Sequence, residues 1–218
     1  MSSPTVASWE RRRRAIVVAL ALTGIGCFGL SWLLPWWTFH LVAPQYPKGL
    51  DLVIHLTGVQ GDVFEIDIIN HYIGMSSLGD AATFERAWSG WLVGGLGVAV
   101  LGAVLLAGRR VSWLAAAVAA AFPLGFVADT LYWLYQSGHD LDSHAPVRIK
   151  PFMPVFLGEG KIGQFVTTAW PNIGFYTVLV GVALLLFAVW QRARVCRVCP
   201  VHDTCGATCP HAFVGVPR

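Results

Sequence analysis

The sequence predicts an all-α transmembrane four-helix bundle with an extracytoplasmic β-hairpin inserted between its first two helices. The chain is 56% hydrophobic and only 12% charged, whereas about 25% of the residues in a soluble domain are charged. Its apolar residues gather in four runs of roughly 20 residues, the length that crosses the hydrocarbon core of a bilayer. A strand-like alternation lies between the first two runs. We therefore interpret the chain as a small integral membrane protein.

The predicted spans are residues 15–36, 91–107, 111–135 and 172–190. The first follows a polar segment, 1–14, as the core of a signal peptide would. It is longer than the roughly 7–15 apolar residues typical of such a core, so we interpret it as a retained anchor. The second span is rich in glycine, which favours close approach of helices. Pro123 predicts a kink in the third.

Basic residues predict the orientation of the spans. Ten of the fifteen lysines and arginines lie at 11–14, 109–110 and 192–218. Each cluster adjoins an apolar run, and the positive-inside rule places such clusters in the cytoplasm. We therefore expect a bacterial inner-membrane protein with both termini cytoplasmic and with segments 37–90 and 136–171 in the periplasm. The same placement makes nucleic-acid binding a poor interpretation of the charge.

The first periplasmic segment has a strand pattern. Leu50, Leu52, Ile54 and Leu56 alternate with other residues, a glycine-containing turn follows at 58–61, and alternation resumes through 64–69. Period-two alternation around such a turn predicts a β-hairpin. An isolated hairpin is only marginally stable, so it needs a further surface to pack on. In the second periplasmic segment the prolines predict little regular structure before a short helix near 162–169.

The predicted periplasmic segments also hold histidines. The histidines are His40, His55, His71, His139 and His144, with Met75, Met153, Asp140 and Asp142 nearby in sequence. Imidazole binds copper and zinc, and thioether binds Cu(I), so these residues are candidate copper ligands. Their spacing matches no compact ligand motif, and ordinary hydrogen bonding in loops is the alternative. No histidine lies inside a predicted span, so we expect no haem b within the bundle.

The predicted cytoplasmic tail, 191–218, carries four cysteines interleaved with two histidines. They are Cys196, Cys199, Cys205 and Cys209, with His202 and His211. Structural disulfides are rare in the reducing cytoplasm. A bound metal is therefore the first interpretation, with zinc in a four-thiolate or mixed Cys/His shell. A thiol-rich tail without metal is the alternative, since the spacing matches neither a ferredoxin run nor a standard zinc finger.

Asp129 lies near the outer end of the third predicted span. Ionisable groups within a span are costly, which makes each one a functional candidate. A proton path would need further buried acids or histidines, and the sequence places none in the spans. We expect instead that Asp129 forms a hydrogen bond with a neighbouring helix.

Two stretches carry a family resemblance. The first runs from Pro44 to Leu50 and ends in the string Asn70-His71-Tyr72-Ile73-Gly74-Met75, and the second runs from Gly138 to Asp142 and continues at 151–154. Both resemble a family of small multi-span bacterial membrane proteins encoded near nitrous-oxide reductase and copper-chaperone genes. The resemblance covers about residues 36–190, without the cysteine-rich tail. It implies association with periplasmic copper enzymes or their maturation, with His71 and Met75 as matching positions.

The sequence contains no Gly-rich phosphate loop, nucleophile elbow or metalloprotease helix. We therefore expect a non-enzymatic accessory or structural subunit of a larger bacterial membrane complex, respiratory or built on a copper enzyme. Its outer loops would contact other subunits or a periplasmic metalloenzyme, and its helices would contact membrane lipids. The alternative is a copper-handling protein that binds the metal through outward histidines and methionine and passes it to a periplasmic copper enzyme.

Overall fold

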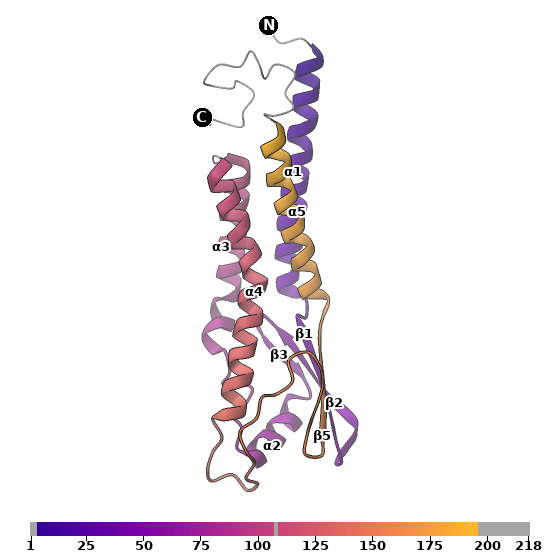
Figure 1. The fold of residues 1–218 in the computed structure, drawn as a ribbon, viewed down its shortest axis with the longest axis vertical. Coiled ribbons are helices and arrows are strands. Elements are labelled where there is room, and N and C mark those ends of the chain that lie inside the picture. The colour runs from indigo at the N-terminus through magenta and orange to yellow at the C-terminus, as the bar shows by residue number, and fades with distance from the viewer. Residues whose placement is uncertain (1–3, 107–108, 196–218) are drawn as a thin grey trace. The chain divides into compact units, whose positions relative to one another are not determined.

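The structure is a computed structural model, and it describes residues 4–106 and 109–195. Its elements, in chain order, are α1 (Pro4–Leu33), β1 (Trp37–Ala43), β2 (Tyr46–His55), β3 (Gly58–Gly61), α2 (Val63–Ile73), α3 (Thr83–Leu106), α4 (Arg109–His139), β4 (Gly158–Ile162), β5 (Phe165–Pro171) and α5 (Ile173–Val195) (Figure 1). The chain divides into two compact units. A helical unit comprises Met1–Gly29, Val93–Phe122 and Thr177–Arg218, and a sheet unit comprises Leu30–Leu92 and Pro123–Tyr176.

Four helices are long and apolar enough to cross a membrane, judged by length and composition. The stretches are Arg11–Leu33, Thr83–Leu106, Arg110–His139 and Ile173–Arg192. Each contains most or all of one predicted span, so the four predicted helices are confirmed as helices. They extend beyond the predicted bounds. In particular, His139 is the last residue of α4 rather than part of a loop, and Pro123 lies inside that helix.

In the helical unit, α1 and α5 cross at two glycines. A Cβ built on Gly24 would lie 3.0 Å from the carbonyl oxygen of Gly181, and one built on Gly181 would lie 2.8 Å from that of Gly24. The two backbones are therefore in contact, and a side chain at either position would separate them. The glycines of α3 behave differently. A Cβ on Gly94, Gly95 or Gly102 would meet no described atom within 4 Å, so these three do not mediate close packing within the described chain.

A buried arginine links three helices of the same unit. Arg192 of α5 is 8% exposed, and it donates to the carbonyl oxygens of Ala103 and Val104 in α3. It also donates to Ser112 Oγ of α4 over 2.8 Å, and that hydroxyl donates to Ala103 O at 2.8 Å. The last carbonyls of a helix have no partner within the helix and carry the negative end of its dipole. Arg192 therefore stabilises the end of α3 and fixes α4 and α5 to it.

The sheet unit contains one five-stranded antiparallel sheet with the order β3-β2-β1-β5-β4. Strands β1, β2 and β3 come from the first predicted periplasmic segment, and β4 and β5 come from the second. The two sets join where β1 pairs with β5, with Trp37 opposite Pro171 and Val42 opposite Val166. A five-stranded sheet and α2 thus stand where the sequence predicted a single β-hairpin. Only the first arm of that hairpin, in β2, is a strand as predicted, and the larger sheet supplies its packing surface.

Three local predictions are wrong. Residues 58–61, predicted as the turn of the hairpin, form strand β3, which pairs with β2. Residues 63–73, predicted as the second arm of the hairpin, form helix α2, and the helix predicted near 162–169 is replaced by β4, the turn and β5. Ile66 and Ile69 of α2 are buried on one face of the sheet, at the spacing that a helix brings to one side. The buried cluster there consists of Trp37, Phe39, Leu50, Leu52, Ile66, Ile69 and Ala169, with Phe126 and Leu134 of α4 packed against it.

Candidate functional site

A row of polar residues crosses the other face of the sheet. His40 of β1 is paired with Asp51 of β2 on one side and with Thr168 of β5 on the other, and Thr168 is paired with Glu159 of β4. Paired residues point to the same face, and neighbours along a strand point to opposite faces. This row therefore lies opposite the buried Trp37 and Phe39. The same face also carries three half-buried valines, Val42, Val53 and Val166. We call its polar residues together with Trp170, namely Thr38, His40, Asp51, Glu159, Lys161, Thr168 and Trp170, the polar face.

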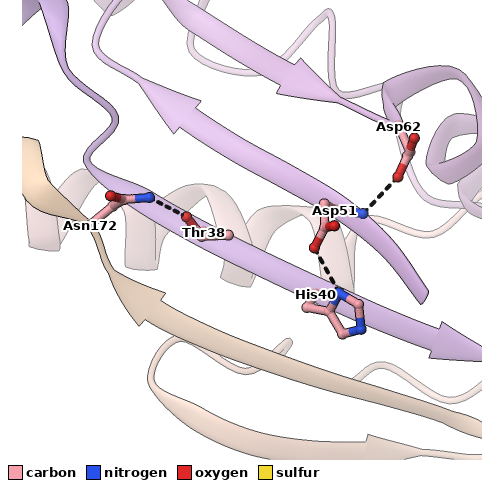
Figure 2. A network of polar contacts seen from close by, with 5 residues as sticks. All are labelled: Thr38, His40, Asp51, Asp62 and Asn172. Carbon is pink, nitrogen blue, oxygen red and sulfur yellow. Dashed lines mark hydrogen bonds and ion pairs between the residues drawn. The ribbon is translucent and has the colours of Figure 1, made fainter. Parts of the chain in front are cut away.

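The centre of the polar face is a histidine–aspartate pair. His40 Nδ1 lies 2.7 Å from Asp51 Oδ1, as Figure 2 shows, and the two side chains are 39% and 64% exposed. The imidazole lies over Gly49, which has a φ of +83°. A Cβ at position 49 would overlap the imidazole ring. The pair therefore depends both on the β1–β2 register and on a glycine that leaves room for the ring.

Asp62 extends the ladder between β2 and β3 with its side chain. The Asp62 N–H donates to Asp51 O at 2.8 Å, and the Asp51 N–H donates to Asp62 Oδ2 at 2.8 Å (Figure 2). The carboxylate takes the place of a strand carbonyl because Asp62 O already belongs to α2, where it accepts from the Ile66 N–H at 3.1 Å. The polar contacts of His40, Asp51 and Asp62 thus connect β1, β2 and the start of α2.

Asn172 makes a similar connection at the end of β5. Its Nδ2 donates to Thr38 Oγ1 at 2.6 Å (Figure 2), and its Oδ1 accepts from the Ile173 N–H at 2.6 Å. Its own N–H donates to Trp36 O at 2.8 Å. Asn172 therefore ties the last strand and the first turn of α5 to β1. The polar face is therefore held beside β3 by Asp62 and at the end of β5 by Asn172, and both carboxylates in Figure 2 already accept hydrogen bonds.

The string Asn70–Met75, which carries part of the family resemblance, forms the end of α2 and its cap. Gly74 ends the helix with a φ of +81°, and its N–H is directed at the carbonyls of Asn70 and His71. Such a left-handed cap is a common end for a helix. The Asp142 N–H donates to Gly74 O at 2.8 Å, and the Val147 N–H donates to Tyr72 O at 3.0 Å. The string is therefore a helix terminus that holds residues 142–147 of the second segment.

Asp142 bonds to one of the predicted copper ligands, and the charge of a second acts on its carboxylate. Its Oδ1 accepts from the His144 N–H at 2.8 Å and lies 3.1 Å from His144 Nδ1. These bonds hold the pKa of the Asp142 carboxyl below its ordinary value, and the charges of His144 and His71 lower that pKa further. His71 and His144, far apart in sequence, thus both act on one exposed carboxylate.

The other predicted ligands lie apart from this pair. His139 stacks on Tyr135 with ring centroids 3.9 Å apart, and its Nδ1 lies 2.9 Å from Tyr135 O. His55 ends β2 opposite Gly58, and Met75 is half-buried after the α2 cap. Within residues 4–106 and 109–195, no group of three or more His, Cys, Asp or Glu residues is placed to hold a metal ion. The copper set stays a prediction.

The remaining sequence predictions concern the tail and Asp129. Cys196, Cys199, Cys205, Cys209, His202 and His211 lie outside the described residues. Asp129 is half-buried in α4, and the polar group beside it is Trp133 of the same helix. The indole nitrogen of Trp133 is buried, and no described residue meets it in hydrogen-bond geometry. The polar group nearest to Asp129 thus belongs to its own helix, α4. The predicted hydrogen bond to a neighbouring helix is not found among the described residues.

Sequence reasoning missed the polar face as a whole. Its signals were present: Gly163-Gln164 is a two-residue turn between Glu159-Gly160-Lys161 and a β-branched run at 166–168. No protein-family model matches the chain, and a search of curated proteins finds no match. The function must therefore be inferred from the residues and their geometry.

Proposed function

We propose that the protein is a non-enzymatic accessory subunit of a bacterial membrane complex, which holds a folded sheet against a partner in the periplasm. The observation that carries this proposal is the difference between the two faces of the sheet. One face is buried by the chain's own core. The other carries the exposed side chains of Asp51, Glu159, Lys161 and Trp170, the last 58% exposed, beside half-buried threonines, His40 and three half-buried valines. Tryptophan is enriched in the parts of interfaces that contribute most to binding.

The way the polar face is held supports this proposal. The bonds from Asp62 and Asn172 tie strand ends to the helices that follow them. A surface that is already ordered loses little conformational entropy on binding, so more of its contact energy remains as affinity. The four apolar helices suit a membrane anchor, and the positive-inside rule predicts a periplasmic location for the sheet unit. The resemblance to proteins encoded near nitrous-oxide reductase genes favours a respiratory or copper-enzyme partner.

Affinity purification of the tagged full-length protein from its native membranes in a mild detergent tests the proposal. We expect a second subunit in a fixed ratio. Trp170→Ser should lower its recovery about tenfold or more, as is typical of an interface residue that dominates binding. Tyr72→Ser is the matched control, because Tyr72 is a comparably exposed aromatic residue of α2, away from the polar face. A wild-type protein that purifies alone under several detergents would contradict the proposal.

Copper handling is the second candidate, and the bonds between His144 and Asp142, in the segment that docks on the end of α2 where His71 lies, favour it. Imidazole and carboxylate suit first-row transition metals, although no three such groups in the described residues are placed to hold an ion. The test is the copper content of the protein purified without the residues after Arg194. Copper that is retained in this truncated protein and lost in its His71→Ala variant would support handling. An equal copper content in the truncated protein and its His71→Ala variant would exclude His71 as a ligand. Zinc that disappears with the tail would assign zinc to the cysteines.

A further inference from the structure

Strand β4 forms one edge of the sheet. It pairs with β5 on one side, and no described strand lies on its other side. The unpaired N–H and C=O groups of such an edge can pair with a strand from another chain. The hydrogen-bond pattern of the sheet identifies which groups of β4 are free.

Antiparallel strands alternate between hydrogen-bonded and non-bonded residue pairs. The Asn172 N–H donates to Trp36 O. This bond means that even-numbered residues of β5 bond toward β1, so its odd-numbered residues bond toward β4. Their partners in β4 are Ile162, Gly160 and Gly158. The N–H and C=O groups of the two intervening residues, Glu159 and Lys161, therefore point away from the sheet.

The side chains along this edge are as informative as the backbone. Glu159 and Lys161 are both exposed on the polar face, and they carry opposite charges two residues apart along the strand. On the other face the strand has Gly160, where a Cβ would lie 3.0 Å from Val155 Cβ. Leu157, directly before β4, is 56% exposed. The edge thus combines free backbone groups, a charge pattern and an adjacent apolar side chain.

We infer that a partner protein adds an extended strand to the β4 edge and pairs with Glu159 and Lys161. This inference rests on the proposed function and names the place where its partner binds. Main-chain hydrogen bonds provide the affinity in this mode of recognition, and side chains provide the specificity. The incoming strand carries a basic residue opposite Glu159 and an acidic residue opposite Lys161, because opposite charges stabilise cross-strand pairs. An apolar residue next to this pair contacts Leu157.

Lys161→Pro and Glu159→Lys test the inference in the same purification. Proline removes the outward N–H of residue 161 and leaves the inward bonds of β4 intact, as is tolerated in edge strands. Lys161→Ala is the matched control that keeps this N–H. We expect the proline variant to recover at least tenfold less partner than the alanine variant. Glu159→Lys leaves the backbone unchanged, so its loss of partner would not reflect misfolding. Hydrogen exchange at residues 159 and 161 should slow only in the complex.

The outcomes separate the two proposals. If the wild-type protein recovers no partner, the proposed function fails. If Trp170→Ser loses the partner while Lys161→Pro and Glu159→Lys both retain it, the proposed function stands and the β4 inference is overturned. If two differently tagged copies of the chain co-purify and Lys161→Pro separates them, the strand at the edge belongs to a second copy, and the inference of a different partner is overturned.

Discussion

At the scale of single residues, Asp62 shows how a side chain can replace the backbone at a junction between strand and helix. Its carboxylate accepts the Asp51 N–H because its own carbonyl has entered α2. We expect Asp62→Ala to lower the free energy of unfolding by about 1 kcal/mol, the net value of one hydrogen bond. Asp62→Asn keeps an acceptor oxygen and should lose less. Thermal unfolding in detergent measures both, and equal losses would contradict this role.

Asp142 gives a pH-dependent prediction at the same scale. Its bonds from His144 hold its pKa below the ordinary value of 3.8. The carboxylate therefore contributes stability above that ordinary value, and the contribution is lost as the pH falls through the lower pKa of the folded state. We expect residues 142–147 to separate from α2 in this acidic range. Hydrogen exchange at the Val147 amide, which bonds to Tyr72 O, reports the separation.

Two substitutions serve as controls for Asp142. Asp142→Asn cannot titrate, so its exchange should no longer change in that acidic range. Asp140→Asn removes a neighbouring carboxylate that accepts from Gln136 Nε2 instead, and it should leave the pH dependence intact. An Asp142→Asn variant with the wild-type profile would show that another group controls this segment.

At the scale of elements, α2 shows where sequence patterns are ambiguous. Residues 63–73 contain Val63 and several isoleucines, which favour strands. They also carry one apolar set at Phe64, Ile68 and Tyr72, which is exposed, and another at Ile66 and Ile69, which is buried. Each set has helical spacing, but along the sequence Phe64, Ile66 and Ile68 also alternate with other residues, as in a strand. Packing on the sheet decides the outcome, and that packing requires strands that lie far away in the sequence.

The same reason limits prediction of the candidate site. The four apolar helices could be predicted from local composition, because a bilayer span is a local property. The polar face could not, because β5 reaches β1 only through long-range pairing. His71 and His144 were predicted as ligands from residue type. The place of Asp142 and His144 at the end of α2, where His71 lies, depends on the docking of the second segment on the α2 cap, which no local pattern contains.

The α1–α5 crossing gives a prediction about the helical unit. Gly24→Val should separate the two helices at Gly181, since backbone and Leu185 atoms lie about 3.0 Å from the added Cβ. Overpacking of this kind typically costs about 1–3 kcal/mol. Gly26→Val is the matched control on the same helix, because a Cβ there meets no described atom within 4 Å. Detergent-solubilised variants compared by thermal unfolding should differ, and equal stabilities would show that the crossing can relax.

At the scale of the whole molecule, both functional proposals depend on the side of the membrane that each segment occupies. Basic clusters predict that the tail cysteines are cytoplasmic and that the sheet unit is periplasmic. Labelling with a membrane-impermeant maleimide tests this orientation in spheroplasts, where the reagent reaches only the periplasmic side of the inner membrane. We expect Ser76→Cys, at an exposed position after α2, to be labelled at once when the tail cysteines are replaced by serine. The native tail should react only after permeabilisation.

The opposite labelling pattern would change the chemistry on both sides. Tail cysteines on the periplasmic side would meet oxidising conditions, where disulfides form and persist, and a zinc-thiolate site would no longer be the first expectation. The exposed pair of His144 and Asp142 would then face the cytoplasm, out of reach of a periplasmic copper enzyme. The β4 edge would still be free, but its partner would have to be a cytoplasmic protein. Labelling therefore comes before the search for a partner, because it determines the compartment from which that partner is drawn.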